Sequence, residues 1–287
     1  MRPSRVIRYG AYPLVFGGSA AAILALTTHR AAPWPGLVLV VLIGVGMVAL
    51  LERLQPYERA WLRDHDDGTA DALHVLVNFG LLSLTAWLLH VIADWMPGPR
   101  PWPLRWPVWS QVLLAGAIVD AGLYGMHRSS HRVRWLWRLH AIHHSAERLY
   151  WMNGERRHPL SAVVLAAPGI AAVAWAGAPP VIASAWLAVL AVHLAFQHAN
   201  VDYSLGPFRH WLGVAETHRW HHKREYEDAQ VNFGEFFMLW DRAFGTYARP
   251  PGAVRAGEVG LREAEVPTAY AAQLLWPFGI ATPRDGA

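Results

Sequence analysis

Residues 106–131 read WPVWSQVLLAGAIVDAGLYGMHRSSH, and two features of this stretch decide the fold of the chain. From 106 to 126 the stretch is apolar except for Asp120, and about 20 such residues form a helix long enough to cross a bilayer core. The run then ends in His127 and His131, which lie four residues apart. On a helix that continues past the membrane, these side chains share a face and can bind one metal ion. The stretch therefore predicts a membrane-spanning helix that leads directly into a metal site.

Five further apolar runs indicate a polytopic membrane protein. They cover residues 10–28, 31–51, 72–93, 160–176 and 181–199. Gly177, Pro179 and Pro180 separate the last two runs as a hairpin. The composition agrees, because only 16% of the residues are charged, whereas soluble domains carry about 25%. We predict an all-α membrane bundle of about six crossings, or four full spans plus a hairpin, with a cytoplasmic histidine-rich helical cap.

The chain is expected to form one membrane-embedded domain over residues 1–287. Within it we place N-terminal spans in 1–56, a catalytic core in 70–247 and an interfacial tail in 248–287. Three arginines precede the first apolar run, as in a signal peptide. That run is longer than a signal-peptide core and a second span follows at once, so we expect a retained helix.

The basic residues indicate the orientation. With six crossings, 22 of the 25 Lys and Arg residues fall on the side that holds both chain ends and the loops 52–70 and 127–158. Cytoplasmic loops are enriched in Lys and Arg, so we expect both termini and the histidine motifs in the cytoplasm. The formal net charge of +4 is weak evidence for nucleic-acid binding, and no nucleic-acid partner is expected.

Two more histidine motifs follow the first. Residues 140–144 read HAIHH and residues 218–222 read HRWHH. In each motif the outer histidines share a helical face, whereas the adjacent pair diverges by about 100°. Together with His127 and His131, these histidines exceed the ligands of one ion and predict two metal ions. Thiolate ligands are excluded because the chain has no Cys. The alternative is a set of solvated or satisfied histidines on basic interfacial helices.

Other polar residues near the spans are weaker candidates. His198 ends the last span on the side of the motifs and is the best ninth ligand, whereas His193 lies on another face and is expected to bond between helices. His158 precedes Pro159, so it is either a ligand or the start of a helix. The candidate metal ligands are His127, His131, His140, His143, His144, His198, His218, His221 and His222, with His158 as a tenth candidate.

Asp120 and Tyr124 are the candidates for support of the metal ligands. They lie seven and three residues before His127, so the three side chains share a helical face. A charged side chain in a membrane is costly unless it is paired. We therefore expect Asp120 to accept a hydrogen bond from a ligand imidazole, with Tyr124 beside it, and to act on catalysis without touching metal. The alternative is that Asp120 is a plain polar residue of the bundle.

The motifs resemble those of the fatty acid hydroxylase / sterol desaturase superfamily, which are integral membrane di-iron oxygenases. Residues 120–131 look like the first histidine box with its upstream Asp and Tyr, and 140–144 and 218–222 look like the second and third boxes. The segment FQHAN at 196–200 is similar to the extra histidine at the end of the last span. Similarity to the closing signature is seen in Asp228, NFG at 232–234, WD at 240–241 and FGT at 244–246. The resemblance covers about residues 70–247.

This resemblance implies two iron ions, which zinc can replace in isolated protein, O2 as oxidant and a membrane lipid substrate. It also implies electrons from NAD(P)H through a carrier such as cytochrome b5 or ferredoxin. No His-Pro-Gly-Gly haem motif occurs, so we expect the carrier to be a separate protein. Arginines of the 127–158 loop are expected to hold anionic headgroups or the acidic carrier.

Three functions fit the sequence, and the leading one is O2-dependent hydroxylation or desaturation of a fatty acyl chain, a sterol or a related lipid. The sequence does not choose between these lipids, between the two reactions, or between oligomeric states. The second function is a non-redox, zinc-dependent membrane lipid enzyme, which needs the same ligands. The third is a metal- or haem-binding electron carrier, which would place its histidines within the spans on facing helices, whereas the motifs here lie outside the spans.

Overall fold

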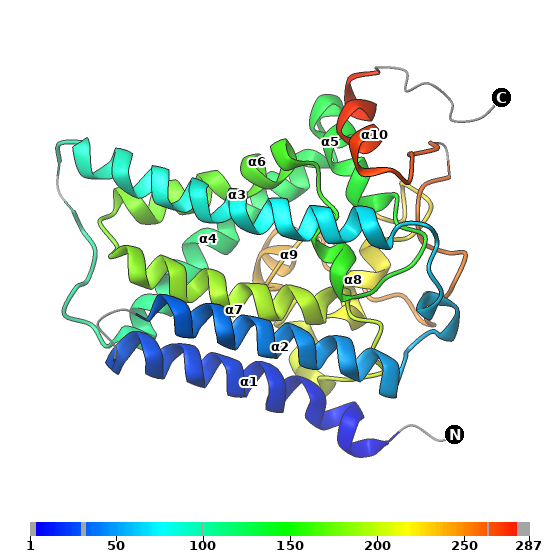
Figure 1. Cartoon of the computed structure of the whole chain (residues 1–287), viewed down its shortest axis with the longest axis horizontal. Helices are drawn as coiled ribbons and strands as arrows, with labels where there is room; N and C mark the ends of the chain where they lie inside the picture. The colour runs from blue at the N-terminus through cyan, green and yellow to red at the C-terminus, as the bar shows by residue number, and fades with distance from the viewer. Residues whose placement is uncertain (1–3, 30–32, 99, 263, 280–287) are drawn as a thin grey trace.

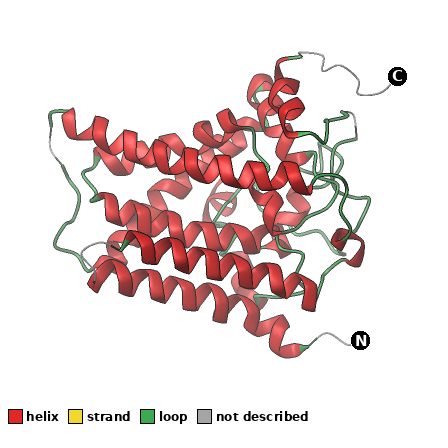
Figure 2. Ribbon diagram, in the orientation of Figure 1, coloured by secondary structure: helices red, strands yellow, loops and turns green. Residues whose placement is uncertain are grey.

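All regular secondary structure is helical in the part of the chain that the computed structural model describes, residues 4–29, 33–98, 100–262 and 264–279 (Figures 1 and 2). The long helices are α1 (Arg5–His29), α2 (Trp34–Leu54), α3 (Gly68–Trp95), α4 (Val108–Ser130), α6 (Pro159–Trp175) and α7 (Pro180–His198). The short α-helices are α5 (Arg134–His144), α8 (Ala215–His221), α9 (Leu239–Phe244) and α10 (Tyr270–Leu275). The 3-10 helices are η1 (Arg59–Leu62), η2 (Trp151–Glu155), η3 (Gly206–His210) and η4 (Trp276–Phe278). The predicted all-α class is confirmed.

Five of the long helices are long and apolar enough to cross a membrane, namely α1, α2, α3, α4 and α7. The remaining one, α6, has 17 residues, which at about 1.5 Å per residue falls short of a core about 30 Å thick. It begins at Pro159, contains Pro168 and ends before the turn at Gly177. The structure therefore has five helices of spanning length where about six crossings were expected, and the shorter α6, which turns directly into α7, packs mainly on α3 and α4.

The long helices differ in how much of their apolar surface is exposed on the outside of the bundle. Helix α7 is the most deeply buried span, and α1, α2 and α4 pack on it. Figure 1 shows α7 between α2 and α3. These two neighbours expose large apolar side chains, such as Leu42, which is 64% exposed, and Leu76, which is 73% exposed. An apolar surface of this kind on a long helix is suited to contact with lipid.

Glycines bring α4 and α6 into backbone contact. A Cβ atom on Gly122 would lie 2.7 Å from the backbone nitrogen of Gly169, and a Cβ atom on Gly169 would lie 2.7 Å from Cα of Val119. Small residues allow such close approach between membrane helices. The contact fixes α4, the helix that carries His127 toward the cap.

The short helices form a cap at one end of the bundle. Figure 1 shows α5, α8 and α10 at the end where α2, α4 and α7 finish. The described part of the expected C-terminal tail packs on this cap, because Val254 and Val259 form a cluster with Trp61 and Leu149. Further on, Oε1 of Gln273 lies 2.7 Å from Nε2 of His74 on α3. The cap therefore has a packed interior, and the candidate histidines lie there.

Candidate metal centre

Nine buried histidines form two groups inside the cap, and within each group one ring nitrogen from every member lies within 4.8 Å of the others. The first group consists of His127, His131, His140, His144 and His221. The second group consists of His143, His198, His218 and His222. The structure thus brings together all nine histidines that the sequence singles out.

Adjacent histidines separate into different groups. On α5, His144 belongs to the first group and His143 to the second, whereas at the end of α8 His221 belongs to the first and His222 to the second. Neighbouring helical residues point about 100° apart, and residues four apart share a face. Each HxxHH motif therefore supplies both groups, and this is the physical reason that two sites form side by side.

Two of the helices of spanning length, α4 and α7, supply the remaining histidines of the two groups. His127 lies in the last turn of α4 and His131 follows at its C-cap, while His198 is the last residue of α7. These residues lie at the ends of the helices because the apolar runs stop there. Each group therefore joins residues of the bundle to residues of the cap.

Ring nitrogens approach one another closely in both groups. The Nε2 atoms of His131 and His144 lie 3.1 Å apart, and Nε2 of His218 lies 2.9 Å from that of His198 and 3.1 Å from that of His222. Two nitrogens bound at about 2.1 Å to one ion and at right angles are separated by about 3 Å. The spacing fits ligands that converge on a shared ion.

Many of the buried ring nitrogens have no other partner. Among the described residues, seven nitrogens from six of these histidines make no hydrogen bond: Nε2 of His127 and His221, Nδ1 of His143, His218 and His222, and both nitrogens of His140. Each such group costs about 1–3 kcal/mol when buried. A metal ion would remove this cost for Nε2 of His127 and His221 and for one nitrogen of His140. The unpartnered nitrogens therefore fit an ion in the first group, while the second group fits one through its converging Nε2 atoms.

The rings are in the protonation state that metal binding needs. Burial lowers the pKa of His140, His144 and His218 well below the usual histidine value, and the neighbouring imidazoles lower it further. The pKa of His143, His221 and His222 is lowered in the same way, with burial as the largest cause. Neutral rings offer a free lone pair to a cation.

Backbone and amide oxygens orient three of the rings. Nδ1 of His127 donates to the carbonyl of Phe233 at 2.8 Å, and Nδ1 of His221 donates to the carbonyl of Val231 at 2.8 Å. Nδ1 of His198 faces Oδ1 of Asn153 at 3.3 Å. When Nδ1 carries the proton, Nε2 is left to face the group. The segment around 231–233 thus sets the orientation of two rings of the first group.

Asp120 has different partners from those expected. Its carboxylate accepts hydrogen bonds from the backbone N–H of Phe236 at 2.8 Å and of Phe237 at 3.1 Å, and from Nε1 of Trp240 at 2.9 Å. The expected bond from a ligand imidazole is wrong, because His127, the candidate ligand on the same helix, donates to a carbonyl instead. Asp120 holds the loop that supplies this carbonyl and is therefore connected to the ring through the backbone.

Tyr124 also contacts the loops after the third motif. Its hydroxyl lies 2.9 Å from Oγ1 of Thr246, and its ring stacks on Phe244 at 5.6 Å between centroids. Phe244 is the last residue of α9, and Thr246 lies two residues after it. Tyr124 therefore anchors the segment 244–246 to α4.

His158 and His193 belong to neither group. His158 is the N-cap of α6, where its Nδ1 accepts from the backbone N–H of Leu160 at 3.1 Å. His193 bonds across the bundle to the Tyr12 hydroxyl at 2.7 Å and to the Gly213 carbonyl at 2.9 Å. His158 therefore has the helix-start position that was the alternative to a ligand, and His193 makes the expected bond between helices to Tyr12 and a second bond to a loop carbonyl.

Three of the seven arginines of the 127–158 loop are unavailable to lipids or a carrier, whereas Arg132, Arg134 and Arg138 are exposed. Arg148, Arg156 and Arg157 are buried. Their guanidinium groups pair with acidic groups at 2.6 Å (Asp67), 3.1 Å (Asp71) and 3.2 Å (Glu235). Burial of a cation requires such pairing. Sequence reasoning missed these acids, and the position of Asp67 and Asp71 at the start of a span was the only local signal.

Comparison with known proteins agrees with the histidine groups, because the matches cover the segment that contains them. A family model described as fatty acid hydroxylase matches residues 112–246, the segment that holds all nine histidines. The chain is 32% identical to ornithine lipid hydroxylase OlsE of Rhizobium tropici over 245 residues, which cover 82% of this chain and 73% of that protein.

Two vertebrate enzymes are similar to the chain over a shorter region. Alkylglycerol monooxygenase of Danio rerio is 30% identical over 155 residues, or 52% of this chain and 32% of that protein. Methylsterol monooxygenase 1 of Danio rerio is 27% identical over 155 residues, or 53% of this chain and 50% of that protein. No solved structure matches the chain.

Proposed function

This chain belongs to the fatty acid hydroxylase family, and we propose that it hydroxylates a membrane lipid with O2 at two metal ions, which are iron in the cell. The observation that carries the proposal is the pair of buried groups of five and four histidines with unpartnered ring nitrogens. No carboxylate or thiolate belongs to either group; the buried Glu235, which lies 3.4 Å from Nδ1 of His127, is paired with Arg157. Imidazole ligands suit iron and leave its positive charge uncompensated, which favours oxidation chemistry.

The reaction balances with an external reductant. One C–H bond of the lipid becomes C–OH with one oxygen atom of O2, while the other oxygen leaves as water after uptake of two electrons and two protons. When bound, the metals supply the activation of O2. The chain itself holds the ring orientations through Phe233, Val231 and Asn153, and burial of the groups excludes bulk water from them.

The surroundings of the centre support a lipid substrate and a separate electron donor. The curated relatives are named for an ornithine lipid, an alkylglycerol and a methylsterol. The cap joins helices of spanning length, so a lipid can reach the centre from the bilayer while a reduced carrier approaches from water. We place the cap in the cytoplasm because 22 of 25 Lys and Arg residues fall on its side. The carrier is then a cytochrome b5 or ferredoxin reduced by NAD(P)H.

Lipid analysis of cells with and without the chain tests the proposal. We expect a lipid species heavier by one oxygen atom, labelled when the cells grow under heavy-isotope O2, and absent when His143→Ala and His221→Ala are combined. Purified protein prepared without O2 should contain about two iron ions per chain, matching the two groups. Zinc in place of iron together with an O2-independent product would instead support the non-redox enzyme.

A further inference from the structure

Glu52, in the last turn of α2, is a buried acid that belongs to neither histidine group. It is 4% exposed, and its Oε1 accepts from the backbone N–H of Trp151 and from the backbone N–H of Asn200, each at 2.8 Å. In the part of the chain that the structure describes, no hydrogen bond or ion pair is made to its other oxygen, Oε2. The two segments that Oε1 joins both lead to His198, a member of the second group.

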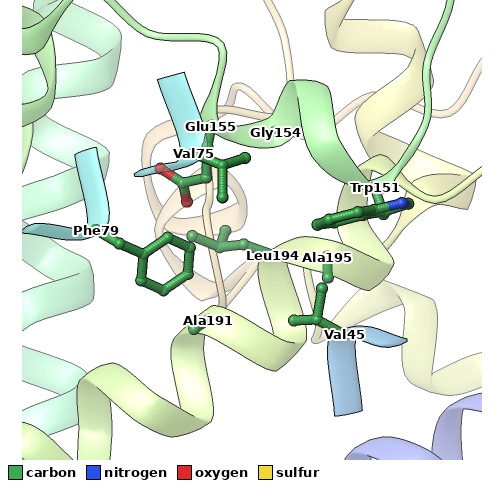
Figure 3. A pocket seen from close by; sticks show the side chains of 9 residues that line it. All are labelled: Val45, Val75, Phe79, Trp151, Gly154, Glu155, Ala191, Leu194 and Ala195. Atoms are coloured by element: carbon green, nitrogen blue, oxygen red, sulfur yellow. The ribbon is translucent and has the colours of Figure 1, made fainter. Parts of the chain in front are cut away.

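The first of these segments is η2, which begins at Trp151. Oδ1 of Asn153 in η2 lies 3.3 Å from Nδ1 of His198, and a Cβ atom at Gly154 would lie 3.2 Å from the same ring. Figure 3 shows Trp151 next to Ala195 of α7, on which η2 packs. The position of η2 on α7 therefore sets the direction of the His198 ring.

The second segment is the turn that follows α7. Asn200 lies two residues after His198, and its side chain accepts from the backbone N–H of Glu58 at 2.8 Å and donates to the Glu58 carbonyl at 3.0 Å. Its backbone carbonyl accepts from the N–H of Tyr57 at 3.0 Å. The chain that leaves α2 thus runs beside the chain that leaves α7 and holds it at several points.

The third histidine motif is tied to the same turn through Arg219. This buried side chain donates to the carbonyl of Ala199 at 2.8 Å and to that of Val201 at 3.2 Å. Its guanidinium carbon lies 3.6 Å from the centre of the Tyr57 ring, a favourable cation–π distance. The turn after α7 therefore connects the end of α2 to α8, which carries the third motif.

We propose that Glu52 is a positioning residue of the second histidine group, because it fixes η2 against the end of α7 and so holds the His198 ring toward the ion. The inference rests on the two-metal centre of the proposed function. It adds a residue outside the segment 112–246 that the family model matches. Both N–H groups converge on one oxygen, so Glu52 acts through an acceptor atom and not through its negative charge. Asp120 differs, since its bonds use both oxygens.

Metal titration of Glu52 variants tests this role. The probe is Co²⁺, which follows Fe²⁺ in the order of metal affinities. It is titrated into the purified full chain in detergent against a competing chelator, and its visible absorption bands report the coordination geometry. Glu52→Met has an unbranched side chain without an acceptor oxygen. It should weaken the binding of one of the two ions by about 10- to 100-fold and change the bands of that ion only.

Two variants of similar shape serve as comparisons. Glu52→Gln should keep most of the affinity for both ions, because its amide oxygen can take the place of Oε1. Glu58→Gln is the matched control from the same loop. Its side chain accepts from the N–H of Ala60 at 3.2 Å, and its bonds to Asn200 use the backbone, which the change keeps. His222→Ala removes a histidine of the second group and so identifies the bands of that group.

The possible outcomes separate the support role from the other readings. Equal weakening of both ions by Glu52→Met, with a lower thermal midpoint, would show a role in the fold as a whole and overturn the inference. Weakening of the first-group ion alone would overturn it as well. A loss in Glu52→Gln as large as in Glu52→Met would show that the charge matters and not the acceptor.

The test does not depend on turnover, so it can fail separately from the proposed reaction. A chain that shows the expected pattern of Co²⁺ binding but makes no hydroxylated lipid would contradict the reaction and still support the role of Glu52. A wild-type chain that binds a single ion would overturn both the two-metal centre and this inference.

Discussion

Replacement of Asp120 by Asn tests whether the buried carboxylate holds the loop behind the first histidine group. The carboxylate is fully buried and accepts three hydrogen bonds, from Phe236, Phe237 and Trp240. An amide keeps one of the two acceptor oxygens and turns an NH2 group toward an N–H donor. The loss of one bond to a charged group, with one buried donor left unsatisfied, should lower the free energy of unfolding by about 2–4 kcal/mol.

The same change should reach catalysis through the backbone. Asp120 fixes residues 236–237, three positions after the Phe233 carbonyl that orients His127. A looser carbonyl allows the ring to turn, and loss of such supporting contacts costs about 10- to 100-fold in activity or metal affinity. We expect turnover to fall by about that factor, while most of the iron is kept, since none of the nine candidate ligands is removed.

The measurements are lipid turnover, iron per chain and the thermal midpoint in detergent. Asp94→Asn is the matched control, because this carboxylate is 76% exposed at the far end of α3. Full activity with an unchanged midpoint would show that the loop does not depend on Asp120. Complete loss of iron would also refute the reasoning, since it would make the carboxylate itself a ligand.

Three further predictions follow from the same geometry. His222→Ala leaves three histidines in the second group and should reduce iron to about one per chain, whereas His221→Ala leaves four in the first and should retain more metal. Loss of both ions from His222→Ala would contradict two separate groups. Arg157→Leu leaves the carboxylate of Glu235, which is 1% exposed, without its charged partner. The change should lower the free energy of unfolding by about 3–5 kcal/mol, measured by thermal denaturation. An unchanged midpoint would show that the protein does not need this ion pair. Alkaline phosphatase fused after Tyr247 should be inactive and a fluorescent protein there should be bright; active phosphatase would reverse the assigned orientation.

The parts of the fold set by local periodicity could be predicted from the sequence. Apolar runs of spanning length gave the long helices, and the i, i+4 spacing of the histidines gave their shared faces. The divergence of adjacent histidines along a helix predicts two sites, and His143 and His144 do lie in different groups. The 17-residue length of α6 was predictable as well, because the apolar run at 160–176 is bounded by Pro159 and Gly177, and the helix runs from Pro159 to Trp175.

The contacts that hold the cap together could not be predicted in the same way. Arg148 and Arg156 pair with Asp67 and Asp71 across 81 and 85 residues of sequence. A sequence shows that these charges exist, but the distance between them depends on how α3 and η2 pack. Arginines that seemed suited to the surface are therefore internal supports of the cap.

The loop after the third motif shows how such distant contacts complete a metal site. At Gly234 a Cβ atom would lie 2.5 Å from the Phe237 carbonyl oxygen and 2.8 Å from Oδ2 of Asp241, so a residue with a side chain does not fit. The bare backbone lets the Asp241 carboxylate accept from the N–H groups of Phe233 and Gly234 at 2.8 and 2.7 Å. The Phe233 carbonyl is thereby aimed at His127. Asp241 and Gly234 thus determine the direction of a ring that lies more than 100 residues earlier in the chain.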